Sequence, residues 1–177
     1  MTLAYVQEPG APLDLSVGFK IVGVIGSSKA DPDILRIAEE LGAEIAKRGA
    51  AVVCGGLTGV MESVCKGARG EGGLTIGIIP SDNRADANQY VQIPIVTGMG
   101  MGRNVMLVKT ADVVIAVGGE YGTLSEIAHA LNLGKTVIGL RTWKLERAHT
   151  KPIPNLIEVE TPAEAVDLAL RTISAKR

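Results

Sequence analysis

The chain has 177 residues, which is about the length of one domain. Hydrophobic residues make up 46% of it and aromatic residues only 3%, so the core must consist of aliphatic side chains, which suit strands buried on both faces of a parallel sheet. The formal net charge is −1, with basic and acidic residues interspersed, and this balance, together with the scarcity of aromatics, argues against a nucleic-acid partner.

The sequence predicts a cytoplasmic protein. Its apolar runs are far shorter than the roughly 20 residues that span a bilayer, so we expect no membrane partner. Residues 1–19 lack the basic start and apolar stretch of a signal peptide, and we interpret them as an N-terminal extension. Cys54 and Cys65 stand in apolar surroundings without the spacing of metal ligands, which indicates buried, reduced thiols and no metal site.

From residue 20 onward, short apolar runs alternate with amphipathic segments. Asp31 before Pro32 is typical of a capped helix start, and Thr161, Pro162 and Glu164 give a second start with the pattern of a capping box. In chain order, the sequence predicts strand 20–26, helix 32–48, strand 50–56, helix 59–73, strand 74–80, strand 90–96, helix 103–111, strand 112–119, helix 123–134, strand 135–140, strand 156–160 and helix 161–177.

This alternation predicts a doubly wound, Rossmann-like α/β fold, in which a parallel sheet carries helices on both faces. Residues 20–177 are expected to form one domain, because no linker, repeat or low-complexity segment divides them. Pro94 cannot donate a ladder hydrogen bond, so the strand at 90–96 is expected at an edge. Ligands of such sheets bind outside the carboxyl ends of the strands, where the strand order reverses, which makes the strand-to-helix loops the candidate site.

Two loops rich in small residues follow the first two strands. Gly26, Ser27 and Ser28 precede a helix start, where hydroxyls and free amides can bind a phosphate; a simple capped turn is the alternative. The small residues of the second loop let a backbone approach a ligand or, alternatively, let strand and helix pack tightly. The candidate residues of this second loop are Gly55, Gly56, Thr58 and Gly59.

The third loop ends in Arg103 and Asn104 at the predicted start of a helix. A cation there opposes the helix dipole by roughly 0.3–1 kcal/mol, so Arg103 indicates a bound anion or, alternatively, exposure to solvent. The fourth loop is a glycine-rich turn before a helix, which is typical of an anion cradle. Its candidate phosphate-binding residues are Gly118, Gly119 and Gly122 in the turn and Thr123 as a cap or a donor.

Two glutamates accompany the fourth loop. Glu126 is expected one helical turn in, facing the crevice, where it would hold a hydroxyl or steer a water; the alternative is a partner of the helix dipole in the first turn. Glu120 adds negative charge where a phosphate would approach. The four loops contain neither a P-loop nor the G-x-G-x-x-G pattern, and the loop at 26–28 lacks the glycines that a pyrophosphate needs, which argues against NAD.

Five segments in this order, VIGSS, VVCGGLTGVME, TIGIIP, GMGMGRN and GGEYGTLSE, resemble the superfamily of the LONELY GUY cytokinin-activating phosphoribohydrolases. The superfamily was long mislabelled as lysine decarboxylases, and it also contains the molybdenum cofactor carrier proteins. The resemblance covers about residues 20–140. It implies a phosphorylated small-molecule ligand and a homodimer or higher homo-oligomer.

The resemblance also implies roles for individual residues. Arg103 and Glu126 fall on the catalytic pair of the phosphoribohydrolases, and they would be catalytic only if this protein is an enzyme. Glu126 would then hold the ribose or the attacking water and stabilise an oxocarbenium ion, while Arg103 would position the nucleotide. Gly119, Gly122 and Thr123 would bind the 5′-phosphate.

Three departures from the hydrolase motif favour the carrier branch: Gly118 replaces its proline, Glu120 its second glycine and Asn104 its lysine. Our first interpretation is therefore a carrier or storage protein that binds molybdenum cofactor or a similar phosphorylated ligand and requires no other cofactor. The alternative is a phosphoribohydrolase that cleaves the N-glycosidic bond of nucleoside 5′-monophosphates. A lysine decarboxylase is rejected, because these loops contain no lysine except Lys29.

Overall fold

The computed structural model describes residues 19–146, 148 and 152–175. All but the last residue of the predicted extension, 1–19, lies outside these ranges. The strands are β1 (Ile21–Gly26), β2 (Ala51–Cys54), β3 (Thr75–Ile79), β4 (Ile93–Val96), β5 (Val113–Val117), β6 (Val137–Leu140) and β7 (Leu156–Val159). The helices are α1 (Pro32–Lys47), α2 (Val60–Gly70), α3 (Arg103–Thr110), α4 (Tyr121–Asn132) and α5 (Pro162–Ala175), with short 3-10 turns η1 (Arg84–Asp86) and η2 (Gly100–Gly102).

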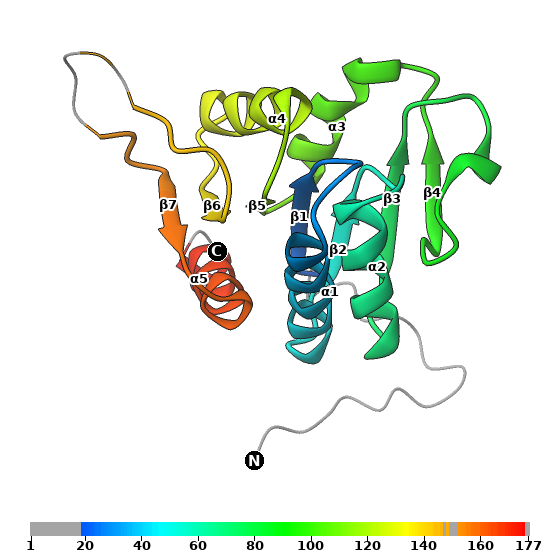
Figure 1. Ribbon diagram of the computed structural model, residues 1–177, viewed down its shortest axis with the longest axis horizontal. Coiled ribbons are helices and arrows are strands. Elements are labelled where there is room, and N and C mark those ends of the chain that lie inside the picture. Colours follow the sequence, from blue (N-terminus) through cyan, green and yellow to red (C-terminus); the bar gives the residue numbers. More distant parts are fainter. Residues whose placement is uncertain (1–18, 147, 149–151, 176–177) are drawn as a thin grey trace.

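The seven strands form one parallel sheet in the order β4-β3-β2-β1-β5-β6-β7, which crosses Figure 1 from right to left. The chain winds outward from β1 to β4, returns to β5 beside β1, and then winds the other way, so the strand order reverses between β1 and β5. The predicted doubly wound α/β fold is confirmed, and β4, which contains Pro94, lies at an edge as expected.

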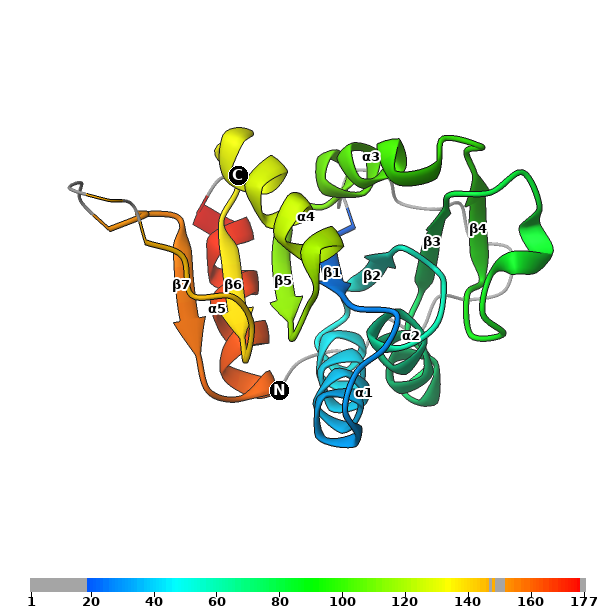
Figure 2. The ribbon, with the colours of Figure 1, turned by 45° about the horizontal axis from the view of Figure 1, so that its top comes forward.

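Helices cover both faces of the sheet. Helices α1, α2 and α5 pack against one face, and α3 and α4 against the other, as Figure 2 shows. Strand β5, which lies next to β1 in the interior of the sheet, is buried along its whole length, VVIAV, because both of its faces meet helices. The core is aliphatic, as the composition requires, and Cys54 and Cys65 are buried in it as free thiols.

The pairing of β1 with β5 positions the functional loops. Gly26 at the end of β1 stands opposite Val117 at the end of β5, so the loops that follow the two strands begin at the same level. Helix α1 then begins at Pro32, as predicted, although Asp31 makes no side-chain capping hydrogen bond. The carboxyl edge of the sheet at the reversal point therefore brings together the strand-to-helix loops that follow these two adjacent strands.

Candidate functional site

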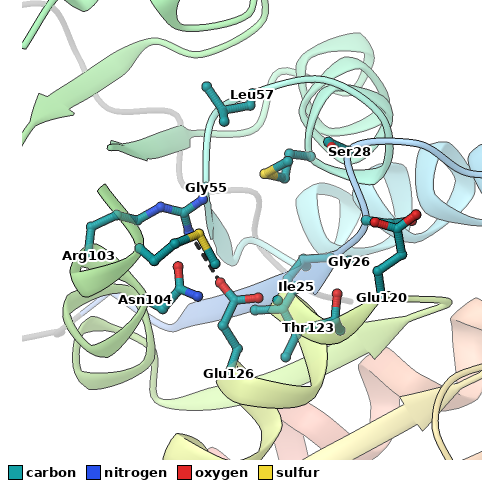
Figure 3. Close-up of a pocket in the computed structure, with 15 residues that line it drawn as sticks. Ile25, Gly26, Ser28, Gly55, Leu57, Arg103, Asn104, Glu120, Thr123 and Glu126 are labelled. Atoms are coloured by element: carbon teal, nitrogen blue, oxygen red, sulfur yellow. Dashed lines mark hydrogen bonds and ion pairs between the residues drawn. The ribbon is translucent and has the colours of Figure 1, made fainter. Parts of the chain in front are cut away.

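A cavity of about 250 Å³ lies at the carboxyl end of β1, beside the point where the strand order reverses (Figure 3). We call it the first cavity. Residues from all four predicted loops contribute to its wall. The lining residues are Val24, Ile25, Gly26, Ser27, Ser28, Gly55, Leu57, Met61, Met101, Arg103, Asn104, Glu120, Gly122, Thr123 and Glu126.

Arg103 and Glu126 form an ion pair inside the first cavity. Arg103 begins α3 and Glu126 lies in the second turn of α4, and Nη1 donates to Oε1 over 3.2 Å. Each residue is only 6% exposed, and Figure 3 shows the two side chains pointing toward one another. Two alternatives are thereby wrong: Arg103 is not exposed to solvent, and Glu126 is not in the first turn where it would face the helix dipole.

Burial changes the acidity of Glu126. Desolvation raises its pKa to about 7, and the nearby Arg103 guanidinium opposes this rise without cancelling it. At neutral pH, the carboxyl group is therefore divided between its charged and its neutral form. A group with this pKa can accept or donate a proton near pH 7, which is what general acid–base chemistry needs.

Two polar atoms beside the ion pair have no hydrogen-bond partner among the described residues. They are Nε of Arg103, a donor, and Oδ1 of Asn104, an acceptor, and both are buried. Gly55 explains how the guanidinium reaches its position, because a Cβ at Gly55 would lie only 2.3 Å from Nη2 of Arg103. Buried polar groups in proteins nearly always have partners, so these two atoms indicate a place for a ligand group.

The start of α4 supplies free amide groups. The first helical hydrogen bond runs from the Leu124 amide to the Glu120 carbonyl, so the amides of residues 121–123 have no acceptor within the helix. Gly118 and Gly119 make the turn with φ of 55° and 123°, and a Cβ at Gly119 would lie 2.6 Å from Cγ2 of Thr123. These amides, at the positive end of the helix dipole, can bind an anion.

The predicted boundary of this helix was wrong by two residues. Thr123 was expected to begin or cap the helix, but α4 starts at Tyr121 and Thr123 is its third residue, 2% exposed. Gly122 was expected in the turn and lies in the first helical turn instead. Thr123 and Gly122 still line the first cavity, from within the helix.

Glu120 stands between two cavities. It is exposed, and Figure 3 shows its side chain extending toward Ser28, on the side away from Arg103. It also lines a second cavity, of about 630 Å³, to which Ser27, Gly118 and Gly119 contribute. The carboxylate of Glu120 therefore lies apart from the buried ion pair and next to the start of α4.

Three predicted residues line neither cavity. A Cβ at Gly56 would lie 2.4 Å from Cδ1 of Ile79, and one at Gly59 would lie 2.4 Å from the Ser27 carbonyl oxygen. The Thr58 hydroxyl donates to the Ser28 carbonyl over 3.1 Å. Thr58 and Gly59 thus contact the backbone of the first loop, and Gly56 packs closely against β3. The predicted role of these three residues in ligand binding stays a prediction.

The apolar part of the first cavity was not predicted from the sequence. Val24, Ile25, Leu57, Met61 and Met101 line it, and Met101 is 67% exposed. Leu57 follows a glycine, and Met101 stands between two glycines. A large apolar side chain in such a glycine-rich segment is exposed to water unless it covers a ligand or another part of the protein. That placement is the signal that identifies them.

The described part of the chain gives two negative findings. None of its helices is long and apolar enough to cross a membrane. None of its His, Cys, Asp and Glu side chains gather in groups of three or more that could hold a metal ion.

Comparisons with known proteins identify the family. A sequence model of the SLOG cluster4 family matches residues 19–166. An uncharacterized protein of Archaeoglobus fulgidus is 43% identical over 149 residues, which cover 84% of this chain and 93% of that protein. A cytokinin riboside 5′-monophosphate phosphoribohydrolase of Mycobacterium marinum is 31% identical over 137 residues, with 67% of this chain and 73% of that protein covered.

Among solved structures, the molybdenum cofactor binding protein of Rippkaea orientalis superposes with a TM-score of 0.80 and 36% identity, covering 89% of this chain and 99% of that one. The resemblance to the LONELY GUY superfamily and to its molybdenum cofactor carrier branch is thus confirmed. With its family model spanning most of the described residues, the chain belongs to the SLOG cluster4 family.

Proposed function

We propose that this protein binds a phosphorylated, nucleotide-like small molecule in the first cavity and carries it without converting it. The observation that supports this most is the buried pair of Arg103 and Asn104, each with an unpartnered polar atom, in a cavity with an apolar remainder. A ligand that offers both an acceptor and a donor would satisfy the two atoms. Its phosphate would lie at the free amides of α4.

We further propose that the ligand is molybdenum cofactor, a ring system that bears a phosphate group. A relative at 36% identity is named for binding it. The available groups fit such a molecule: Arg103 and Asn104 would meet polar atoms of the ring, and Leu57 and Met101 would pack against its faces. Ser27 and the first amides of α4 would hold the phosphate. The cofactor is cargo in this proposal, and no other cofactor is required.

A second candidate function is phosphoribohydrolase activity. The pKa of about 7 at Glu126, opposite Arg103, favours it, because this carboxyl group is placed to act on a ligand near neutral pH. Glu126 would hold the ribose or the attacking water, and Arg103 would position the nucleotide. The expected homo-oligomer, the absence of a nucleic-acid partner and the cytoplasmic location accompany either function as predictions.

The shared ligand site is tested by calorimetric titration of the protein with AMP. We expect Arg103→Ala to weaken binding about tenfold or more, because a hydrogen bond to a charged group contributes about 1.5–3 kcal/mol. The matched control is Arg36→Ala, which removes the same charge from the exposed surface of α1 and should leave the affinity unchanged.

The double variant Arg103→Gln/Glu126→Gln repeats this test without leaving a lone buried carboxylate. Its affinity for AMP should fall as it does in Arg103→Ala. Equal affinities in the wild type and both Arg103 variants, or no binding of AMP to the wild type, would contradict the proposed site.

A further inference from the structure

The second cavity lies on the other side of the loop that follows β1. Its volume is about 630 Å³, and it opens beside the start of α1, the turn before α4 and the segment after β6. It shares Ser27 and Glu120 with the first cavity. Its lining residues are Ser27, Lys29, Ala30, Asp31, Ile34, Gly118, Gly119, Glu120, Arg141, Thr142 and Trp143.

Arg141 has an unusual backbone conformation at this cavity. Its φ is 51°, and it is the one non-glycine residue with positive φ among those that the structure describes. L-residues rarely adopt this region, and those that do cluster at binding sites, where the surrounding structure holds them. The adjacent Thr142 hydroxyl donates to the Gly118 carbonyl and ties this segment to the turn before α4.

The charges of the second cavity are unpaired. Lys29 and Arg141 both line it, and neither forms an ion pair with any residue in the described ranges. Two carboxylates, Asp31 and Glu120, line it as well. A nucleotide suits such a mixed lining, because its phosphate attracts the cations while the amino groups of its ring donate to carboxylates.

Trp143 provides a flat apolar surface in the same place. Its ring is held by a hydrogen bond from Nε1 to the Glu120 carbonyl, 3.3 Å long, and by Tyr121, whose ring centroid lies 6.0 Å away. The indole is half-buried, so part of it faces the cavity that it lines. An aromatic ring of a ligand can stack on such a surface.

The two cavities meet where α4 presents its free amides. The first cavity, at about 250 Å³, is smaller than the roughly 300–1,000 Å³ of typical small-molecule sites, whereas the second is within that range. We infer that the second cavity is a second subsite, which takes an aromatic ring and its phosphate at the far end of the ligand whose first end occupies the first cavity. The ligand is then a dinucleotide-like form of the phosphorylated molecule proposed above, in which a second ring-bearing end is joined through phosphates at the start of α4.

This inference rests on the proposed function, because it extends the ligand of the first cavity. It does not require the G-x-G-x-x-G turn that binds the pyrophosphate of NAD, because the phosphates would lie at the start of α4 and between Lys29 and Arg141. The side chains of the second cavity are distinct from Arg103, Asn104 and Glu126, so the two sites can be altered separately.

The test compares AMP with diadenosine diphosphate, in which two adenosines are joined by two phosphates. Trp143 is the only tryptophan of the chain and lines the second cavity, so the tryptophan emission reports on a ring that stacks there. We expect diadenosine diphosphate to bind at least tenfold more tightly than AMP in calorimetry and to quench the tryptophan emission at saturation. Lys29→Ala and Arg141→Gly should each remove most of this advantage and leave the affinity for AMP unchanged; glycine is chosen at Arg141 because it adopts positive φ readily.

The control is Lys144→Ala, which removes an exposed charge next to Trp143 from a side chain that does not line the second cavity. Equal affinities for the two probes, or an unchanged Trp143 emission at saturating diadenosine diphosphate, would overturn the second subsite. If AMP still binds and depends on Arg103, the proposed function survives that result. If neither probe binds, both proposals fall.

Discussion

At the scale of single residues, the ion pair of Arg103 and Glu126 dominates the site. Burying both charges costs solvation that one hydrogen bond of 3.2 Å only partly restores, which is why the pKa of Glu126 rises in spite of its partner. The unpartnered Nε of Arg103 and Oδ1 of Asn104 add to this cost. Such a cluster lowers the stability of the folded protein on its own. A polar ligand that bonds to these atoms would offset this cost, so the cluster is typical of a binding site.

The raised pKa of Glu126 makes stability depend on pH. Its pKa is 4.5 as a free group and about 7 in the folded protein, so the folded state binds the proton more tightly. The resulting stabilisation is complete below about pH 4.5 and is lost as the pH rises through 7. Relative to Glu126→Gln, the wild type should lose about 3 kcal/mol of unfolding free energy over this range, measured by urea unfolding at a series of pH values.

An exposed glutamate provides the comparison for this experiment. Glu40 lies on the exposed side of α1, and Glu40→Gln should keep the pH dependence of the wild type. The opposite slope, or the same profile in the wild type and Glu126→Gln, would show that the carboxyl group is not buried as described.

The sequence predicted both members of the ion pair as site residues but not their pairing. Arg103 was selected for its place at a helix start after a glycine-rich loop, Glu126 for its place one turn into the next such helix, and both for their match to the hydrolase motif. Their contact joins two helices and residues 23 positions apart, and it exists only because α3 and α4 pack on the same face of the sheet. Spacing along the chain carries no information on such a contact.

At the scale of elements, glycines let α1 and α2 approach closely. A Cβ at Gly67 would lie 1.8 Å from the Glu39 carbonyl oxygen, and one at Gly42 would lie 2.0 Å from that of Val64. This close packing matters for the site, because the loops at 26–31 and 55–59 lead directly into the two helices. Both glycines lie mid-helix, where glycine is otherwise unfavourable by about 1 kcal/mol relative to alanine.

Gly67→Ala should therefore destabilise the protein, by about 1–3 kcal/mol or more, because the added methyl group meets backbone atoms that cannot move separately. Gly70→Ala is the matched control in the same helix, since a Cβ there meets nothing within 4 Å. It should be neutral or stabilising by up to about 1 kcal/mol. Chemical unfolding of the two variants measures the difference, and equal stabilities would contradict the close contact.

The elements themselves could be predicted well where a cap or a breaker marks their ends. Pro32 begins α1 as expected, and the Thr161 hydroxyl accepts a hydrogen bond from the Glu164 amide at the start of α5, as the capping-box pattern requires. The start of α4 was misplaced because Glu120 makes no side-chain cap and Gly122 is an unusual residue inside a helix. There, tertiary packing decides the boundary and local preference does not.

At the scale of the whole molecule, the alternation of strands and helices was enough to predict the sheet and the edge that carries the site. The reversal of strand order between β1 and β5 creates a crevice at the carboxyl ends of the strands, as in other doubly wound sheets, and in this chain four loops line the cavity there. The second cavity could not be predicted, because Arg141 and Trp143 follow β6 in an irregular segment without a pattern. Its existence depends on that segment folding back onto the turn before α4.

The measurement that tests the central claim most directly is the release of free base from AMP and from N6-substituted AMP, with the wild type and Glu126→Gln side by side. A carrier binds AMP in the first cavity and returns it intact, so we expect no free base from either protein while calorimetry shows binding. Free base released by the wild type and not by Glu126→Gln would contradict the carrier function and make this protein a phosphoribohydrolase.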